Sequence, residues 1–118
     1  PEAMPAMDFL QQIKQQMQTA CIRYTKPVQD KVKRIAICGG SGSFLLKDAM
    51  AAQADVFISA DYKYHQFFDA DGRIMIADIG HYESEQFTKE LLYDVLKKKF
   101  TTFAVRFSKV NTNPINYL

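Results

Sequence analysis

A histidine and a glutamate, His81 and Glu85, stand four residues apart at the start of a segment with helical periodicity, directly after an apolar run that ends in Gly80. On a helix, residues at this spacing stack one turn above another and point the same way. An inward carboxylate beside an imidazole is costly to desolvate unless something neutralises it, and a metal ion can use both groups as ligands. The pair is therefore predicted to bind metal. The alternative is a His–Glu hydrogen bond that closes the first helical turn.

The segment that carries this pair is expected to be one long helix over residues 81–99. Placing its residues at about 100° intervals gives the helix one broad apolar face. That face comprises Phe87, Leu91, Leu92, Val95 and Leu96. His81 and Glu85 fall within the same arc and are expected to face the sheet, whereas Glu83 falls on the opposite, polar side.

A glycine-serine segment, with Gly40, Ser41 and Gly42, follows another apolar run and is a second candidate. Leu45 occupies the third glycine position of a GxGxxG pattern and no GK[ST] sequence is present, so a nucleotide fingerprint is not supported. Two interpretations remain open. Backbone N–H groups at the start of the next helix would cradle an anion or a polar ligand, or the glycines permit a tight turn in which strand and helix approach closely.

The segment DYKYH supplies a third group of polar side chains, Asp61, Lys63 and His65, again directly after an apolar run. These residues are candidates for orienting a substrate. Asp61 has the alternative role of a helix cap, and His65, which stands among aromatic residues, that of a packed or interface residue. Open α/β sheets place ligand sites at the carboxyl ends of their strands, and all three candidate groups follow such an end.

The elements that must position these groups alternate between strand and helix. Apolar runs at residues 35–37, 56–58 and 74–76 predict three neighbouring parallel strands. Asp8 is expected to cap a first helix, and residues 101–108 are expected to form a last strand. The predicted fold class is α/β, with a mainly parallel sheet and flanking helices in a single domain over residues 1–118.

Composition narrows the function classes. The chain has 118 residues, 47% of them hydrophobic, and a net charge of +2, which is too mild to indicate binding to nucleic acid or to a membrane surface. Two cysteines without a CxxC pairing favour a reducing, cytoplasmic setting. The opening PEAMPAM resembles a connection between domains, so the chain is expected to be a fragment of a longer protein.

Two segments, GGSGSFLLKDAMAAQADVFISADYKYHQ and IADIGHYESE, together resemble the C-terminal half of the Nif-three-like dinuclear metal-binding family, labelled GTP cyclohydrolase 1 type 2. The likeness covers about residues 1–107. It implies that His81 and Glu85 bind two adjacent metal ions and that Glu85 bridges them. It also implies that the other ligands come from an N-terminal half outside these residues, and that the protein assembles into ring-shaped hexamers.

The resemblance implies a metal-dependent hydrolase in which two divalent ions, such as zinc, iron or manganese, lower the pKa of a bridging water. One imidazole and one carboxylate make an incomplete site, so these residues alone are expected to bind metal weakly or not at all. The competing hypothesis is a metal-binding scaffold or regulatory interaction protein without turnover. Loss of activity in Glu85→Gln with the fold intact would favour the enzyme.

Overall fold

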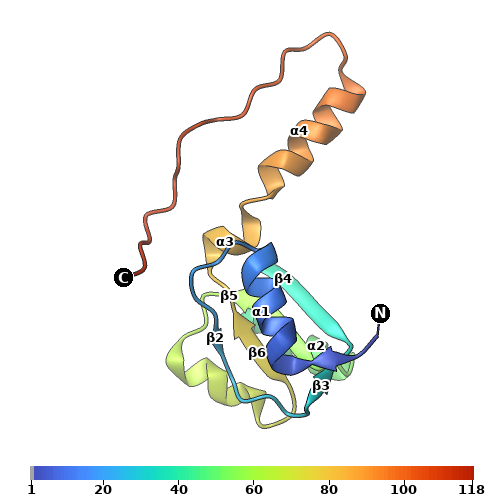
Figure 1. The fold of residues 1–118 in the computed structure, drawn as a ribbon, viewed down its shortest axis with the longest axis vertical. Helices are drawn as coiled ribbons and strands as arrows, with labels where there is room; N and C mark the ends of the chain where they lie inside the picture. The colour runs from blue at the N-terminus through green and yellow to red at the C-terminus, as the bar shows by residue number, and fades with distance from the viewer. Residues whose placement is uncertain (1) are drawn as a thin grey trace.

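The computed structural model describes residues 2–118 and has one main sheet of four strands in the order β2-β6-β5-β4 (Figure 1). The strands are β2 (Arg23–Tyr24), β4 (Ile35–Ser41), β5 (Val56–Ala60) and β6 (Met75–Asp78). β4, β5 and β6 run parallel, with Ile37 opposite Ile58 and Ile58 opposite Ala77. β2 runs antiparallel to β6 at the edge of the sheet. The predicted α/β fold with its three neighbouring parallel strands is confirmed.

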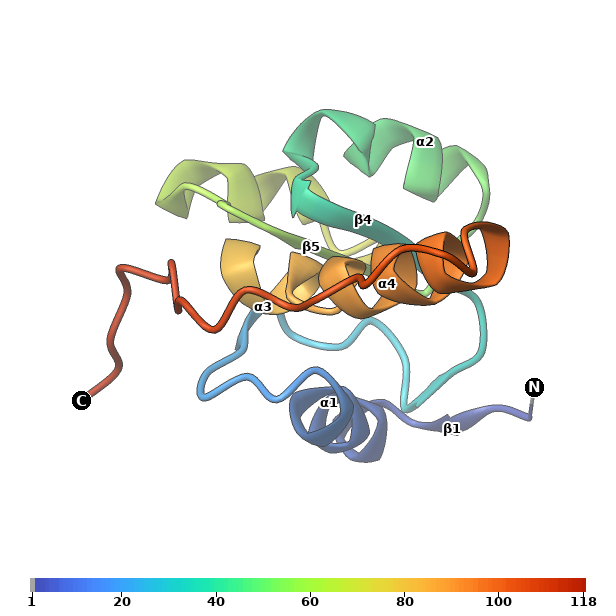
Figure 2. The same cartoon turned by 90° about the horizontal axis from the view of Figure 1, so that it is seen from above.

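The described residues form the helices α1 (Ala6–Gln16), α2 (Leu46–Ala51), α3 (His81–Glu85) and α4 (Thr88–Lys99), with the 3-10 segments η1 (Ser43–Leu45) and η2 (Tyr64–Ala70). Some of them cover the two faces of the sheet. Figure 2 shows α1 on one side of the sheet and α2 with η2 on the other. A small second sheet pairs β1 (Met4–Pro5) with β3 (Lys31–Val32) beside α1.

The central strands are buried on both faces, which explains their unbroken apolar runs. Along β5, Val56 and Ile58 pack with Leu10 of α1, whereas Phe57 between them packs with Leu46 of α2. Successive side chains of a strand point to opposite faces, so one strand supplies both cores. The sheet is thereby packed on both faces, and its carboxyl edge lies between the two cores.

Two expected helix boundaries are wrong. The first helix begins at Ala6 with Pro5 at the N-cap position, so Asp8 lies inside the first turn and does not cap it. The predicted helix over residues 81–99 is two helices, α3 and α4, separated at Gln86 and Phe87. Gln86 ends α3 and donates a hydrogen bond from its side-chain nitrogen to the carbonyl of Met17 at 2.7 Å, which ties α3 to the end of α1.

The C-terminal quarter differs most from expectation. α4 extends away from the sheet (Figure 1), and its apolar face does not pack on the body, since Leu91 and Leu92 are 64% and 55% exposed. The strand predicted over residues 101–108 is absent from the described structure. Because α4 carries the chain away from the sheet, this segment has no neighbouring strand with which to form a ladder. Among residues 2–118, no helix is both long and apolar enough to cross a membrane.

Candidate functional site

Three strand ends meet at the carboxyl edge of the sheet and bring four of the candidate residues together. Gly40 lies at the end of β4, Asp61 directly follows β5, and His81 and Glu85 lie on α3 after β6. His81 Nδ1 is 2.6 Å from Asp61 Oδ2, and His81 Nε2 is 3.4 Å from Glu85 Oε2. The imidazole is therefore held between two carboxylates that come from different elements.

The predicted inward orientation of the pair is wrong. The side chains of His81 and Glu85 are 49% and 51% exposed, whereas Glu83, expected on the solvent side, is only 5% exposed. α3 sits at the end of the sheet instead of over its face, so the side that carries the pair meets solvent. The desolvation argument for a metal ion therefore does not hold, and the case for a metal rests on the geometry of the donor atoms.

Asp61 orients the imidazole. A carboxylate on Nδ1 fixes the tautomer of a histidine and leaves Nε2 as the atom that can bind a metal. The hydrogen bond to Asp61 is the main reason why the pKa of His81 lies above its usual value. Burial acts against it, and the charges of Asp61 and Glu85 add to the rise. Asp61 does not cap the following helical segment, because Lys63 occupies the N-cap position of η2.

Gly40 brings the end of β4 close to the pair. A Cβ at this position would lie 2.6 Å from Glu85 Oε1 and 3.1 Å from His81 Nε2, and the backbone has a φ of +63°. Its N–H donates to Ser84 Oγ at 2.8 Å, and Ser84 in turn donates to the carbonyl of His81 at 2.8 Å. The glycine therefore permits a close approach, and Ser84, which no sequence pattern singled out, links the loop to α3.

The rest of the glycine-serine segment lies farther along the same loop. Ser41 pairs with Ala60 across the sheet. A Cβ on Gly42 would come within 2.8 Å of Cys38 Cβ, so close packing requires a glycine there too. An anion cradle in this segment stays a prediction, and one of its backbone donors, the N–H of Gly40, is already used by Ser84.

Lys63 and His65 are both exposed on the segment after Asp61. The amide of Lys63 donates to the side-chain oxygen of Gln66 at 2.8 Å, which fixes the start of η2. Within residues 2–118, neither side chain forms a hydrogen bond or ion pair with His81 or Glu85. A role for Lys63 and His65 in orienting a substrate stays a prediction.

Asp78 positions two parts of the site and was not singled out from the sequence. It is only 4% exposed, and its carboxylate accepts the N–H of Tyr62 at 3.0 Å and that of Gly80 at 3.1 Å, together with an ion pair from Arg23. Tyr62 follows Asp61, and Gly80 precedes His81. One buried carboxylate at the end of β6 thus fixes the backbone beside both partners of the Asp61–His81 contact.

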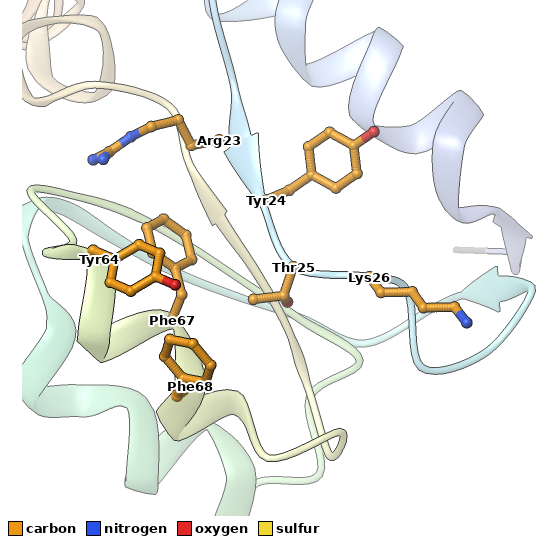
Figure 3. Close-up of a pocket in the computed structure, with 7 residues that line it drawn as sticks. All are labelled: Arg23, Tyr24, Thr25, Lys26, Tyr64, Phe67 and Phe68. Carbon is orange, nitrogen blue, oxygen red and sulfur yellow. The ribbon is translucent and has the colours of Figure 1, made fainter.

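A separate cavity of about 430 Å³ lies beside β2 and η2 (Figure 3). It is lined by Arg23, Tyr24, Thr25, Lys26, Tyr64, Phe67 and Phe68. Figure 3 shows the three rings of η2 gathered on one side, whereas Lys26 points away from them. Arg23, which pairs with Asp78, has its Cζ 5.4 Å from the centroid of the Phe67 ring. The lining of this cavity includes none of the candidate residues.

The donor atoms of the site amount to an imidazole nitrogen and one carboxylate. No cluster of three or more His, Cys, Asp and Glu side chains arranged to hold a metal occurs in the part of the chain that the structure describes. Asp61 contacts the other ring nitrogen of His81, so it orients the imidazole and adds no further free donor. A protein zinc site normally needs three or four ligands. The arrangement therefore has the donor types of a metal site, but it supplies only two donor groups.

Comparison with known proteins matches the sequence resemblance. The chain is 37% identical over 120 residues to a GTP cyclohydrolase 1 type 2 homolog of Staphylococcus aureus strain MSSA476. The aligned region covers 98% of this chain and 32% of the relative. The fold of this chain is similar to that of Staphylococcus aureus protein SA1388 in its crystal structure, with a TM-score of 0.84. The two sequences are 32% identical, over 99% of this chain and 39% of the other.

A Bacillus cereus protein related to NIF3 is similar at a TM-score of 0.80 and 26% identity, over 99% of this chain and 34% of the other. The chain thus spans about a third of the length of the curated relatives that it matches. The model of one family, Duf34/NIF3 (NGG1p interacting factor 3), matches residues 1–114. Because that match covers nearly all of the sequence, the chain belongs to the Duf34/NIF3 family.

Proposed function

We propose that this chain is the C-terminal part of a metal-dependent hydrolase and contributes His81 and Glu85 to a centre of two divalent ions. The observation that carries the proposal is the contact of His81 Nδ1 with Asp61 at 2.6 Å, which leaves Nε2 beside the Glu85 carboxylate. This carboxylate–histidine arrangement is the usual support of a metal-binding imidazole. Zinc, iron or manganese would suit such mixed nitrogen and oxygen donors.

The residues of the chain have distinct roles in this proposal. Glu85 would bridge the two ions, His81 would bind one of them, and Asp61 would hold the imidazole in place. Divalent ions bound there would supply Lewis acidity and lower the pKa of a coordinated water. Gly40, which has no side chain, leaves room beside both ligands, where a Cβ would lie 2.6 Å from a carboxylate oxygen of Glu85.

The remaining ligands would come from outside these residues. The chain covers 32% of the length of its Staphylococcus aureus relative, so an N-terminal part with further donor side chains is a natural source. The relative's name suggests GTP as the substrate to test first. A reducing, cytoplasmic location belongs to the same proposal, since Cys21 and Cys38 are free cysteines. The absence of nucleic-acid binding belongs to it as well, since the net charge is only +2.

A chimeric chain tests the metal centre. It joins the preceding part of the Staphylococcus aureus relative to residues 1–118, and its metal content is compared by elemental analysis with that of residues 1–118 alone. We expect about two ions per chimeric chain and well under one per short chain, because two ligands are too few for a protein zinc site. Glu85→Gln should empty the centre and His81→Ala should remove at least one ion, whereas Glu90→Gln, which alters an exposed glutamate of α4, should retain both.

Metal affinity should also depend on pH with a defined sign. A metal binds the neutral imidazole, and the pKa of His81 is raised by Asp61, so binding should weaken as the pH falls through a value above about 6.5.

Tight binding by the short chain, or full metal content in the chimera carrying His81→Ala or Glu85→Gln, would contradict the proposal. GTP turnover that disappears in Glu85→Gln without unfolding would establish the enzyme.

The exposed face of α4 favours a second candidate function, a metal-binding scaffold that works through its assembly. Leu91, Leu92 and Val95 are 64%, 55% and 52% exposed, and a contiguous apolar face of this kind commonly marks an interface. A ring-shaped hexamer is the assembly that we propose for the whole protein. Normal cellular function of the Glu85→Gln variant would favour this candidate over the enzyme.

Sedimentation checks the association. Residues 1–118 should sediment as oligomers at high concentration, and Leu91→Glu should shift them toward monomer because it places a charge within the apolar face. Lys98→Glu introduces the same side chain at an exposed position of the same helix and should leave the association unchanged. A strict monomer at every concentration would contradict self-association through α4.

A further inference from the structure

A cavity of about 390 Å³ lies directly beside the candidate metal ligands, between α3 and the C-terminal tail. It is lined on α3 and just beyond it by His81, Tyr82, Glu85 and Gln86, and on the tail by Thr112, Asn113, Pro114 and Ile115. Figure 1 shows the tail running back from the far end of α4 toward α3. The volume falls within the range of about 300–1,000 Å³ that is usual for small-molecule sites.

The lining of this cavity is mostly uncharged and partly apolar. Among the described residues that line it, none is a lysine or arginine, and the one charged residue besides the imidazole is Glu85. A phosphate or carboxylate group would find no counter-charge in that lining and would be repelled by Glu85. Tyr82, Pro114 and Ile115 supply apolar surface that suits the flat faces of a ring.

Hydrogen-bonding groups on the tail give the cavity a polar side. Asn113 uses its side-chain oxygen to accept the N–H of Ile115 at 3.1 Å, and its own N–H donates to Asn111 Oδ1 at 3.0 Å. These local bonds shape the tail and leave the side-chain nitrogen of Asn113 as a donor. Together with the hydroxyl of Thr112, it can pair with the carbonyl and N–H groups of a ring amide.

Tyr117 fastens the end of the tail to α3. Its pKa lies above the usual value because of burial and then because of the nearby negative charge of Glu83. Glu83 is 5% exposed, and its Oε2 has no hydrogen-bond partner within residues 2–118. Gly80 makes room for this contact, since a Cβ there would lie 3.2 Å from the Tyr117 hydroxyl and would overlap the Glu83 carboxylate.

We propose that the tail residues 112–115 form the outer wall of a substrate pocket for an uncharged ring amide, held over His81 and Glu85 by the contact between Tyr117 and Glu83. The inference rests on the proposed function in one respect, since the reacting carbonyl of the ring would face the metal ligands. The pocket admits the ring of a substrate and excludes its charged groups. Any phosphate carried by a substrate would therefore lie outside this cavity.

A matched pair of probes tests the pocket without metal or turnover. The ¹⁵N-labelled chain of residues 1–118 is titrated with uracil and with orotate, which is uracil bearing a carboxylate, and amide shifts are followed by NMR. Uracil should shift the amide signals of residues 82, 86, 112, 113 and 115, with an affinity at least tenfold above that of orotate. No shift at these residues with millimolar uracil, or equal binding of orotate, would overturn the inference.

Variants of Tyr117 and Ile115 test whether the tail forms one side of the pocket. Tyr117→Phe removes the hydroxyl that lies near Glu83 and should weaken uracil binding about 2- to 10-fold, whereas Tyr64→Phe, which removes the hydroxyl of an exposed tyrosine in η2, should leave it unchanged. Ile115→Lys places a cation at a half-exposed position in the wall and should reverse the preference in favour of orotate. If Ile115→Lys still preferred uracil to orotate by the same factor, residues 112–115 would not line the pocket.

The outcomes separate this inference from the proposed metal centre. Ile115 and Tyr117 contribute no metal ligand in the proposal, so the metal content of the chimera should survive Ile115→Lys and Tyr117→Phe. Absence of uracil binding in an unsubstituted chimera that holds its metal would reject the pocket alone. Uracil binding at residues 112–115 in a chimera that holds no metal would reject the metal centre alone.

Discussion

Replacing Gly40 by alanine is expected to empty the proposed metal centre of the chimera while lowering the free energy of unfolding by only about 1–2 kcal/mol. The backbone at Gly40 has a φ of +63°, where a residue with a Cβ is destabilised by about that amount. The new Cβ would lie 2.6 Å from Glu85 Oε1. Because Glu85 is half-exposed, its carboxylate can swing aside at little cost in stability, but it then leaves the position that bridging requires.

Gly72→Ala is the matched control for this prediction. Gly72 has a nearly identical φ of +62°, but a Cβ there would meet nothing within 4 Å. Both variants should therefore lose similar stability in urea unfolding, and only Gly40→Ala should lose metal by elemental analysis. Equal metal content in the two variants would show that the approach of Gly40 to Glu85 has no role in metal binding.

Asp78→Ala is expected to destabilise the short chain by about 3 kcal/mol, because it leaves the N–H groups of Tyr62 and Gly80 and the guanidinium of Arg23 without their carboxylate. It should also lower the pKa of His81 toward the ordinary value near 6.5. Tyr62 and Gly80 flank Asp61 and His81, so their release loosens the contact that raises this pKa. Urea unfolding measures the first effect, and NMR titration of the imidazole measures the second.

Asp55→Ala provides a control that separates the two effects. Asp55 also accepts two backbone N–H groups, from Lys33 at 2.7 Å and Arg34 at 2.8 Å, but it lies at the amino end of β5. Its loss should destabilise the fold and leave the pKa of His81 unchanged. If Asp55→Ala moved that pKa as far as Asp78→Ala does, the effect would reflect general loosening and Asp78 would have no positioning role.

The sheet and the site edge were predictable because their signals are local. Unbroken apolar runs at β4, β5 and β6 indicate strands buried on both faces, and the alternation of strands with helices indicates parallel pairing. Parallel strands end at a common edge, so the polar residues after them were expected to lie near one another. The ordered motifs also sufficed to indicate the family, which the match over residues 1–114 confirms.

The roles of single side chains within that edge depended on tertiary structure. Asp61 was a candidate for capping or substrate orientation, and only the folded chain shows that it contacts His81, twenty residues away in sequence. Asp78 appeared as the last residue of an apolar run, and its sequence position carries no sign that its carboxylate binds Tyr62, Gly80 and Arg23. Such contacts join separate elements, and the spacing of residues within one element does not specify them.

Helical periodicity identified the apolar face near the C-terminus but could not state what covers it. The pattern predicted one helix on the sheet over residues 81–99, whereas Gln86 ties α3 to Met17 and α4 leaves the body with Leu91 exposed. The apolar face of a helix depends on the residues of that helix alone, but its burial depends on whichever surface lies opposite. The sequence by itself therefore determined the three parallel strands, their common edge and the polar residue types that follow it. Tertiary structure decided which side chains meet there, because those contacts are set by the packing of distant segments.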